Sequence, residues 1–224
     1  NDQTMPEISA KYPSLFTPAG FTFSIWGVIY LALLVFLIWQ ALPAQRENAK
    51  IAAISTLFKL NCLLNALWIA VWHYDLVIVS LLVMLAILVT LILIYRSLIA
   101  TIADAPWAEH LALYLPFSIY TGWITLATIA NASVVQTAYG LDDAAIGAVQ
   151  WTLLKLAAAG AIGATMILRF RDAPFALVIA WGAYGIASMQ TGTPAVAGSA
   201  LTLSLLMLIL AGKDGLDRLL TKRS

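Results

Sequence analysis

The chain has 224 residues, of which 62% are hydrophobic and 10% are charged, and its formal net charge at pH 7 is +1. A soluble domain is typically about 45–50% apolar and about 25% charged, so this composition excludes a soluble enzyme and a disordered protein. The near-neutral charge also excludes a nucleic-acid partner, which would require a basic surface. We therefore expect an integral membrane protein surrounded by a lipid bilayer.

Residues 1–20 precede the first long apolar run, and the part from Tyr12 to Gly20 contains prolines at positions 13 and 18. Proline restricts the backbone to few conformations. We therefore expect residues 1–20 to form an ordered outer loop that folds over the mouth of a cavity, and we call this segment the access loop.

Seven apolar stretches follow, each close to the 20 residues that a helix needs to cross a bilayer. Their continuous Leu- and Ala-rich composition favours helices over a β-barrel, whose strands would alternate in polarity. The expected fold is an all-α polytopic transmembrane bundle with seven spans. The spans cover roughly Phe21–Leu42, Ser55–His73, Leu76–Ser97, Glu109–Asn131, Ala144–Phe170, Ala173–Gln190 and Pro194–Gly212.

Lysine and arginine alternate along the connections between these spans. The segments after spans 1, 3, 5 and 7 are basic, whereas those after spans 2, 4 and 6 contain neither residue and the one after span 4 carries Asp142 and Asp143. Basic segments stay on the cytoplasmic side, so residue 1 is expected outside and the C-terminus in the cytoplasm. The basic residues are Arg46, Lys50, Lys59, Arg96, Arg169, Arg171, Lys213, Arg218, Lys222 and Arg223.

Five of the eight tryptophans fall in the outer halves of four different spans with this topology: Trp26, Trp68, Trp72, Trp123 and Trp151. One interpretation is an aromatic belt at the membrane interface. The alternative is a cavity with aromatic walls that opens outward, because flat indole faces suit a planar apolar ligand.

Polar residues inside the spans are the remaining candidates. Asn61 and Asn65 lie four residues apart in span 2, where amides usually bond to a neighbouring helix; a ligand contact is the alternative for Asn65, which shares a face with Trp68. Lys155 lies near the centre of span 5, and an intramembrane charge suggests a functional site. Its alternative is a lysine that reaches the interface or bonds to a neighbouring amide or carbonyl.

Three motifs resemble those of the TspO/MBR family of translocator and tryptophan-rich sensory proteins. Pro13-Ser14, Pro18 and the run from Trp26 to Tyr30 resemble the family's P-S-W-x-P-P followed by W-x-x-x-Y. The run Asn61–Trp68 resembles Q-L-x-L-N-x-x-W, and Trp123, Ala127 and Asn131 keep the spacing of W-x-x-F-A-x-x-L-N. Leu15 replaces the loop tryptophan, Asn61 replaces the glutamine, and the spacing from Pro116 to Trp123 is longer by three residues.

The resemblance covers about residues 12–135 and implies a domain organisation. Residues 21–135 would form a TspO-like core of four helices, matching helices two to five of the family's five-helix bundle. The family's first helix would then lie upstream of residue 1. Residues 136–224 would add a three-helix transmembrane module.

The resemblance also implies a function, namely binding of a tetrapyrrole such as porphyrin or haem, or a similar planar apolar ligand, in an outward-facing cavity. The protein would be a sensor or transporter, in a bacterial cytoplasmic membrane and often as a homodimer. No metal site and no other cofactor are expected. The expected ligand-binding residues are Pro18, Trp26, Tyr30, Asn65, Trp68, Trp123, Ala127 and Asn131.

Two alternatives remain open at this point. An enzyme that degrades porphyrin would act through the paired tryptophans, although no acid–base constellation supports it and we assign no catalytic residue. A structural or accessory subunit of a larger membrane complex would dock through the small-residue stretch from Ala157 to Ala164, which lets another helix approach closely.

Overall fold

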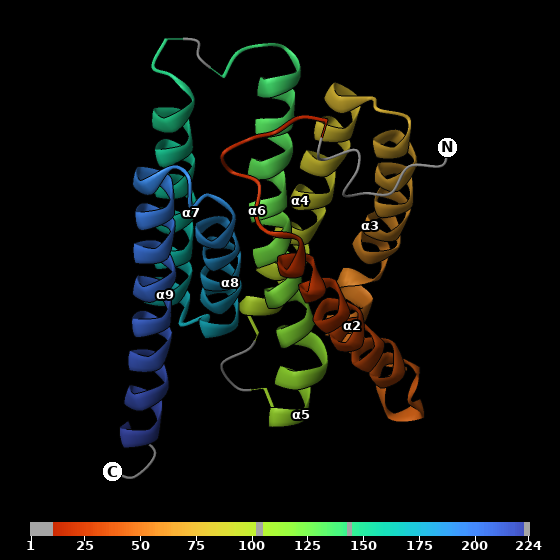
Figure 1. The fold of residues 1–224 in the computed structure, drawn as a ribbon. Helices are drawn as coiled ribbons and strands as arrows, with labels where there is room; N and C mark the ends of the chain where they lie inside the picture. Colours follow the sequence, from red (N-terminus) through yellow and green to blue (C-terminus); the bar gives the residue numbers. More distant parts are fainter. Residues whose placement is uncertain (1–10, 102–104, 143–144, 222–224) are drawn as a thin grey trace.

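The computed structural model describes residues 11–101, 105–142 and 145–221, and every regular element among them is a helix (Figure 1). The first ten residues of the access loop, Asp143, the predicted start of span 5 at Ala144, and Lys222 and Arg223 lie outside the described residues. The elements are η1 (Gly20–Ser24), α2 (Ile25–Ala41), η2 (Pro43–Gln45), α3 (Ala49–His73), α4 (Val77–Ile99), α5 (Trp107–Glu109), the π-helical turn η3 (His110–Tyr114), α6 (Leu115–Ala138), α7 (Ala148–Phe170), α8 (Ala173–Met189) and α9 (Pro194–Thr221).

The predicted all-α polytopic bundle is confirmed. In the part of the chain that the structure describes, six helical segments are long and apolar enough to cross a membrane, and α8 is a shorter apolar helix of 17 residues. At about 1.5 Å per residue α8 is about 25 Å long, slightly less than a hydrocarbon core of about 30 Å. Its side chains are mostly buried, because α8 lies between α6 on one side and α7 and α9 on the other (Figure 1).

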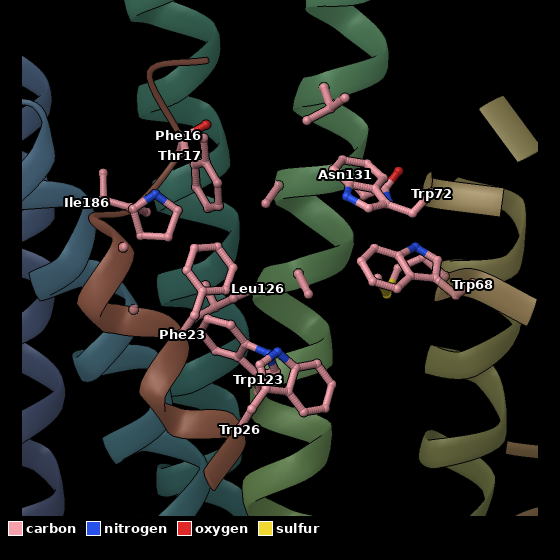
Figure 2. A pocket seen from close by; sticks show the side chains of 17 residues that line it. Phe16, Thr17, Phe23, Trp26, Trp68, Trp72, Trp123, Leu126, Asn131 and Ile186 are labelled. Carbon is pink, nitrogen blue, oxygen red and sulfur yellow. The ribbon is translucent and has the colours of Figure 1, made fainter. Parts of the chain in front are cut away.

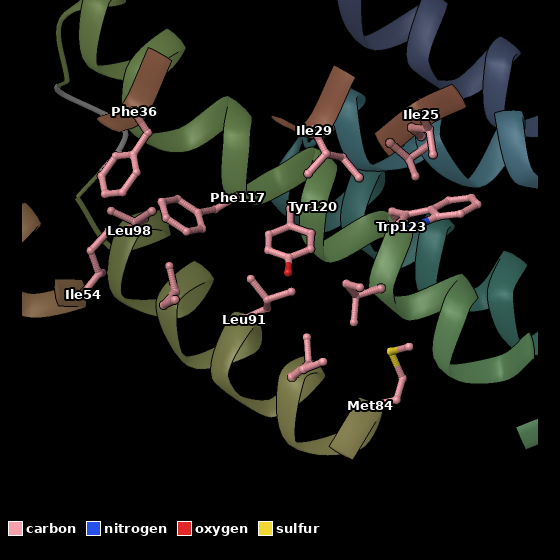
Figure 3. Packing of buried hydrophobic residues seen from close by; sticks show 14 of the residues in the cluster. Ile25, Ile29, Phe36, Ile54, Met84, Leu91, Leu98, Phe117, Tyr120 and Trp123 are labelled. Atoms are coloured by element: carbon pink, nitrogen blue, oxygen red, sulfur yellow. The ribbon is translucent and has the colours of Figure 1, made fainter. Parts of the chain in front are cut away.

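Two apolar cores meet at α6 and α8. The first joins α2, α3, α4 and α6 and includes Val178 of α8; Figure 3 shows Phe36 and Phe117 in it, and these two rings meet Phe58 edge to face. The second joins α6, α7, α8 and α9, and it also holds Phe16 from the access loop. Since α6 supplies Trp123 to one core and Leu126 to the other, it belongs to both.

The ends of several helices differ from the predicted spans. α3 begins at Ala49 rather than Ser55, because the Asn48 side chain caps it by accepting bonds from the Lys50 and Ile51 amides. α9 continues past Gly212 to Thr221, where an ion pair between Asp214 and Arg218, one turn apart, supports a charged helical end.

The fourth span also differs from its prediction of Glu109–Asn131. Its helical segment runs from Trp107 to Ala138 and contains the π-helical turn η3 before α6 begins. In a π-helix the hydrogen bonds reach one residue further than in an α-helix, and such turns often mark functional places. A pattern of apolar residues does not reveal this local change of winding.

The odd-numbered spans of the prediction point in one direction. The C-terminal ends of α2, α4, α7 and α9 all lie towards the lower side of Figure 1. Arg96, Arg169 and Arg218 belong to the last turns of α4, α7 and α9. The alternation of basic connections along the sequence is therefore matched by alternating helix directions.

Candidate functional site

A pocket of about 280 Å³ lies between η1, α2, α3, α6 and α8, below the access loop (Figure 2). Its polar lining is sparse, and among the described residues that line it none carries a formal charge. The lining residues are Phe16, Thr17, Pro18, Gly20, Phe23, Trp26, Trp68, Trp72, Met84, Trp123, Leu126, Ala127, Ala130, Asn131, Val134, Gly182 and Ile186.

Two pairs of tryptophans form different parts of the wall. Trp26 of α2 meets Trp123 of α6 edge to face, with ring centroids 6.4 Å apart. Trp68 and Trp72 lie one turn apart on α3, and their rings stack at 5.3 Å with an interplanar angle of 17°. Figure 2 shows the first pair at one end of the pocket and the second pair along its side. The walls therefore present aromatic faces and edges, which suit a flat apolar molecule.

Three hydrogen-bond donors in this wall have no partner within the structure. The indole Nε1 atoms of Trp68 and Trp123 and the amide Nδ2 of Asn131 are buried and unpaired. The Asn131 Oδ1 atom lies 3.2 Å from the Ser80 hydroxyl, whose single hydrogen is shared between this oxygen and the Val77 carbonyl at 2.8 Å. Unpaired buried donors are costly, and indole nitrogen and amide nitrogen can only donate. These three neutral N–H groups therefore lie within the pocket wall rather than on its open surface.

The described part of the access loop, from Lys11 onward, is tied at both of its ends. At its start, Lys11 and the Tyr12 hydroxyl bond to the Asp75 carboxylate in the turn between α3 and α4, at 2.9 and 3.0 Å. At its end, the Ala19 amide donates to the Gly185 carbonyl of α8 at 3.0 Å, and Gln190 donates to the Thr17 carbonyl at 3.2 Å. The described part of the loop thereby lies beside the pocket, which Phe16, Thr17 and Pro18 help to line.

Acidification is expected to loosen the first of these two ties. The bond from Lys11, more than the bond from Tyr12, holds the pKa of Asp75 below its usual value of 3.8, although partial desolvation opposes this shift. Because the folded pKa is lowered, the stabilisation is complete above the usual pKa and is lost as the pH falls through the folded value. We expect Asp75→Asn to lower stability by at most about 1 kcal/mol at pH 7. Thermal unfolding of both proteins in detergent between pH 7 and pH 2 tests this, since their difference should shrink towards the acid end. A constant difference would contradict the role of the carboxylate.

The family to which the chain belongs follows from a comparison with known proteins. A model of the family described as TSPO-like protein matches residues 1–212. The chain belongs to the TSPO-like protein family. No curated protein and no solved structure matches the chain. The match extends beyond residue 135, so the TSPO-like region includes α7, α8 and most of α9.

Six of the eight predicted ligand-binding residues of this TSPO-like protein line the pocket. They are Pro18, Trp26, Trp68, Trp123, Ala127 and Asn131. Tyr30 and Asn65 do not. The Tyr30 ring is 60% exposed and stacks on the outside of Trp26, with centroids 5.4 Å apart. The Asn65 amide donates to the carbonyl and side-chain oxygens of Asn61, at 2.8 and 3.0 Å.

The polar residues of span 2 form a contact between helices. Asn61 is 1% exposed and donates to the Thr90 hydroxyl of α4 at 2.8 Å, so the pair Asn61 and Asn65 links α3 to α4. Trp151 of α7, predicted at the level of the other outer tryptophans, does not line the pocket. Lys155 donates to the Gln136 side chain of α6 at 2.6 Å, which matches the alternative of a lysine bonded to a neighbouring amide.

Several pocket residues were missed by sequence reasoning. Gly182 and Ile186 belong to α8, which the sequence analysis placed in a separate module. Small and aliphatic residues in a transmembrane helix carry no signal of a binding site, so only the packing of α8 against α6 reveals them. Trp72 and Phe23 were detectable as aromatic neighbours of Trp68 and Trp26. The other residues missed are Phe16, Thr17, Gly20, Met84, Leu126, Ala130 and Val134.

A buried carboxylate outside the pocket was also missed. Asp172, between α7 and α8, is 0% exposed. It accepts bonds from the Ser118 and Tyr95 hydroxyls at 2.5 and 2.6 Å, from the Tyr114 hydroxyl at 3.4 Å, and from the Phe175 amide at 3.0 Å. Asp172 follows Arg171 in the short connection between two predicted spans, where a charged residue is expected to face water. The sequence therefore carries no sign of this buried role. The carboxylate joins α4, η3, α6 and α8.

The small-residue stretch of α7 packs within the chain. A Cβ atom at Gly160 would lie 2.9 Å from Leu203, and one at Gly163 would lie 2.8 Å from Met207, both on α9. These two positions of the proposed docking surface are therefore covered by a helix of the same chain. This favours the intramolecular role of the stretch over docking of an accessory subunit.

Proposed function

We propose that this integral membrane TSPO-like protein binds a planar apolar ligand in the tryptophan-lined pocket and acts as a sensor or transporter of that ligand. The tetrapyrroles porphyrin and haem, and molecules of similar shape, are the class that the family resemblance suggests. The observation that carries the proposal is the pocket itself, which four tryptophans line and whose described lining residues carry no formal charge.

The lining restricts the chemistry of the ligand. The N–H groups of Trp68, Trp123 and Asn131 are buried in the wall, so a carbonyl, ether or ring nitrogen of a flat ligand would reach them only after the surrounding side chains move. A charged carboxylate would lose its hydration in this uncharged lining without gaining a cation. The acidic groups of a porphyrin would therefore remain outside, near the access loop, while a ring edge enters the pocket.

The residues fit a tetrapyrrole ring better than they fit an iron ion. Haem iron takes His, Cys, Met or Tyr as axial ligands, and of these residue types Met84 alone belongs to the described lining. The cavity of about 280 Å³ lies near the lower end of the range of about 300–1,000 Å³ for small-molecule pockets. It would enclose a ligand of two or three fused rings, or one edge of a larger tetrapyrrole.

The charge pattern supports the proposed orientation. If the basic ends of α4, α7 and α9 face the cytoplasm, the access loop and the pocket would lie in the outer half of the proposed bacterial cytoplasmic membrane. A ligand would then reach the pocket from the outer side. This arrangement suits either sensing of an external molecule or the first step of its transport.

Titration with protoporphyrin IX tests the proposal. We expect saturable quenching of tryptophan emission in the purified protein, because ring contact with four pocket tryptophans brings the porphyrin within energy-transfer distance. Flavone, a neutral planar ketone, should compete, whereas palmitate, an apolar but flexible chain, should not. Quenching that rises linearly, as for free tryptophan amide in the same micelles, would contradict the proposal.

Reconstituted vesicles separate the two roles. A transporter delivers protoporphyrin IX to an internal binding protein faster than empty vesicles do, whereas a sensor binds the porphyrin without such delivery. The same preparation can be used for both measurements.

A further inference from the structure

Helix α8 contacts the pocket in two ways, although it comes from the part of the chain that carries none of the recognised motifs. Gly182 and Ile186 line the pocket directly. The Gly185 carbonyl of this helix and the side chain of Gln190, which caps its end, bond to the access loop, and the indole of Trp181 bonds to Thr22 of η1. Figure 2 shows Ile186 beside Phe16 and Thr17 of the access loop.

Gly182 controls the position of a second pocket residue. A Cβ atom built at Gly182 would lie only 2.3 Å from Leu126 Cδ1 and 3.6 Å from Leu126 Cγ. The close atom is the free end of a flexible side chain, so the Leu126 side chain would have to turn away. Leu126 itself borders the pocket, which is the open space next to it. A methyl group at position 182 is therefore expected to push Leu126 into the pocket and so to reduce the pocket's volume.

Gly185 allows the segment that follows the access loop to sit directly on α8. A Cβ atom there would lie 2.0 Å from the Thr22 hydroxyl and 2.9 Å from Thr22 Cβ. Thr22 is 0% exposed, and its carbonyl accepts a bond of 2.9 Å from Trp181 Nε1. The contact between η1 and α8 is thus too close for any side chain at position 185, and it fixes the height of the loop over the pocket.

We propose that α8 determines which ligands the pocket accepts, with Gly182 and Ile186 as its specificity-determining residues. This inference rests on the proposed binding function and deepens it. The space at Gly182 lets the Leu126 side chain lie against α8 and away from the pocket. Ile186 fills space between α8 and the access loop. Planar ligands of different size should therefore respond in opposite ways to substitutions that add or remove volume on α8.

Two probes of different size test this inference in the purified full chain: protoporphyrin IX as the large one and flavone as the small one. Gly182→Ala should weaken protoporphyrin IX binding by about tenfold, the effect of one methylene in a tight apolar pocket, and change flavone binding less than threefold. Ile186→Ala should act in the opposite sense and improve the ratio of protoporphyrin IX to flavone affinity. Dissociation constants come from tryptophan quenching.

Gly160→Ala is the matched control for Gly182→Ala. It places the same methyl group 2.9 Å from the end of a leucine, Leu203, at a helix contact that does not border the pocket. Its affinity ratio should equal that of the unchanged protein. If Gly182→Ala and Ile186→Ala leave the ratio unchanged while both probes bind, the inference about α8 is wrong and the binding function stands. If the unchanged protein binds neither probe, both proposals are wrong.

Discussion

Replacing Asp172 by alanine is expected to destabilise the protein by about 3 kcal/mol or more. The substitution removes the acceptor of three hydroxyl groups and one backbone amide, all in a site with no exposure to solvent. Removing one partner of a buried charged network typically costs about 3–5 kcal/mol, because the remaining groups stay buried and unpaired. Thermal unfolding in detergent, followed by circular dichroism, measures the effect.

Two further variants decide whether the bonds cause this loss. Asp172→Asn keeps one side-chain oxygen for the Phe175 amide, and the tyrosine hydroxyls can turn to accept from its NH₂ group, so its loss should be clearly smaller. Glu47→Ala removes an exposed carboxylate and should leave the unfolding temperature unchanged. If Asp172→Ala were no less stable than Glu47→Ala, the carboxylate would not join the helices as described.

The second large effect is expected on binding, from the double substitution Trp26→Phe and Trp123→Phe. The smaller rings keep the site apolar but withdraw aromatic area from a ligand, and Trp123→Phe also removes one of the unpaired N–H donors. Aromatic contacts contribute about 0.5–1.5 kcal/mol each, so two should cost about 2 kcal/mol, or roughly a thirtyfold increase in the dissociation constant. Porphyrin absorbance gives a measurement that does not depend on the substituted tryptophans.

The control for this experiment is Trp107→Phe. Trp107 lies in α5, is 75% exposed and does not border the pocket, so its replacement should leave protoporphyrin IX binding unchanged. Equal affinities for the double variant and for this control would remove Trp26 and Trp123 from the ligand site. The porphyrin-binding site would then have to lie elsewhere in the protein.

Much of the fold could be predicted from the sequence because a bilayer imposes length and apolarity on each helix. The predicted span Ala173–Gln190 differs from α8 by one residue, and the predicted end of span 5 at Phe170 is the observed end of α7. Helix ends that depend on side-chain caps or ion pairs were harder to predict from the sequence. Asn48 and Asp214 extend α3 and α9 through local bonds that hydropathy does not register.

The pocket could be predicted only in part, for a similar reason. Tryptophans such as Trp26 and Trp123 stand out by their chemistry and by their depth in a span. Gly182 matters because Leu126 lies against it, and Asp172 matters because three hydroxyl groups from distant helices converge on it. Such roles arise from packing between segments far apart in the chain, which one sequence does not display.

The position of α6 in both apolar cores has a consequence for how the molecule comes apart. Trp123 and Leu126 lie one turn apart on this helix and belong to different cores. Exposing either core would remove packing from α6, and we therefore expect neither core to open while the other keeps its full stability. The bundle should then unfold as one cooperative unit in spite of its two cores, and a ligand held against α6 would stabilise both at once.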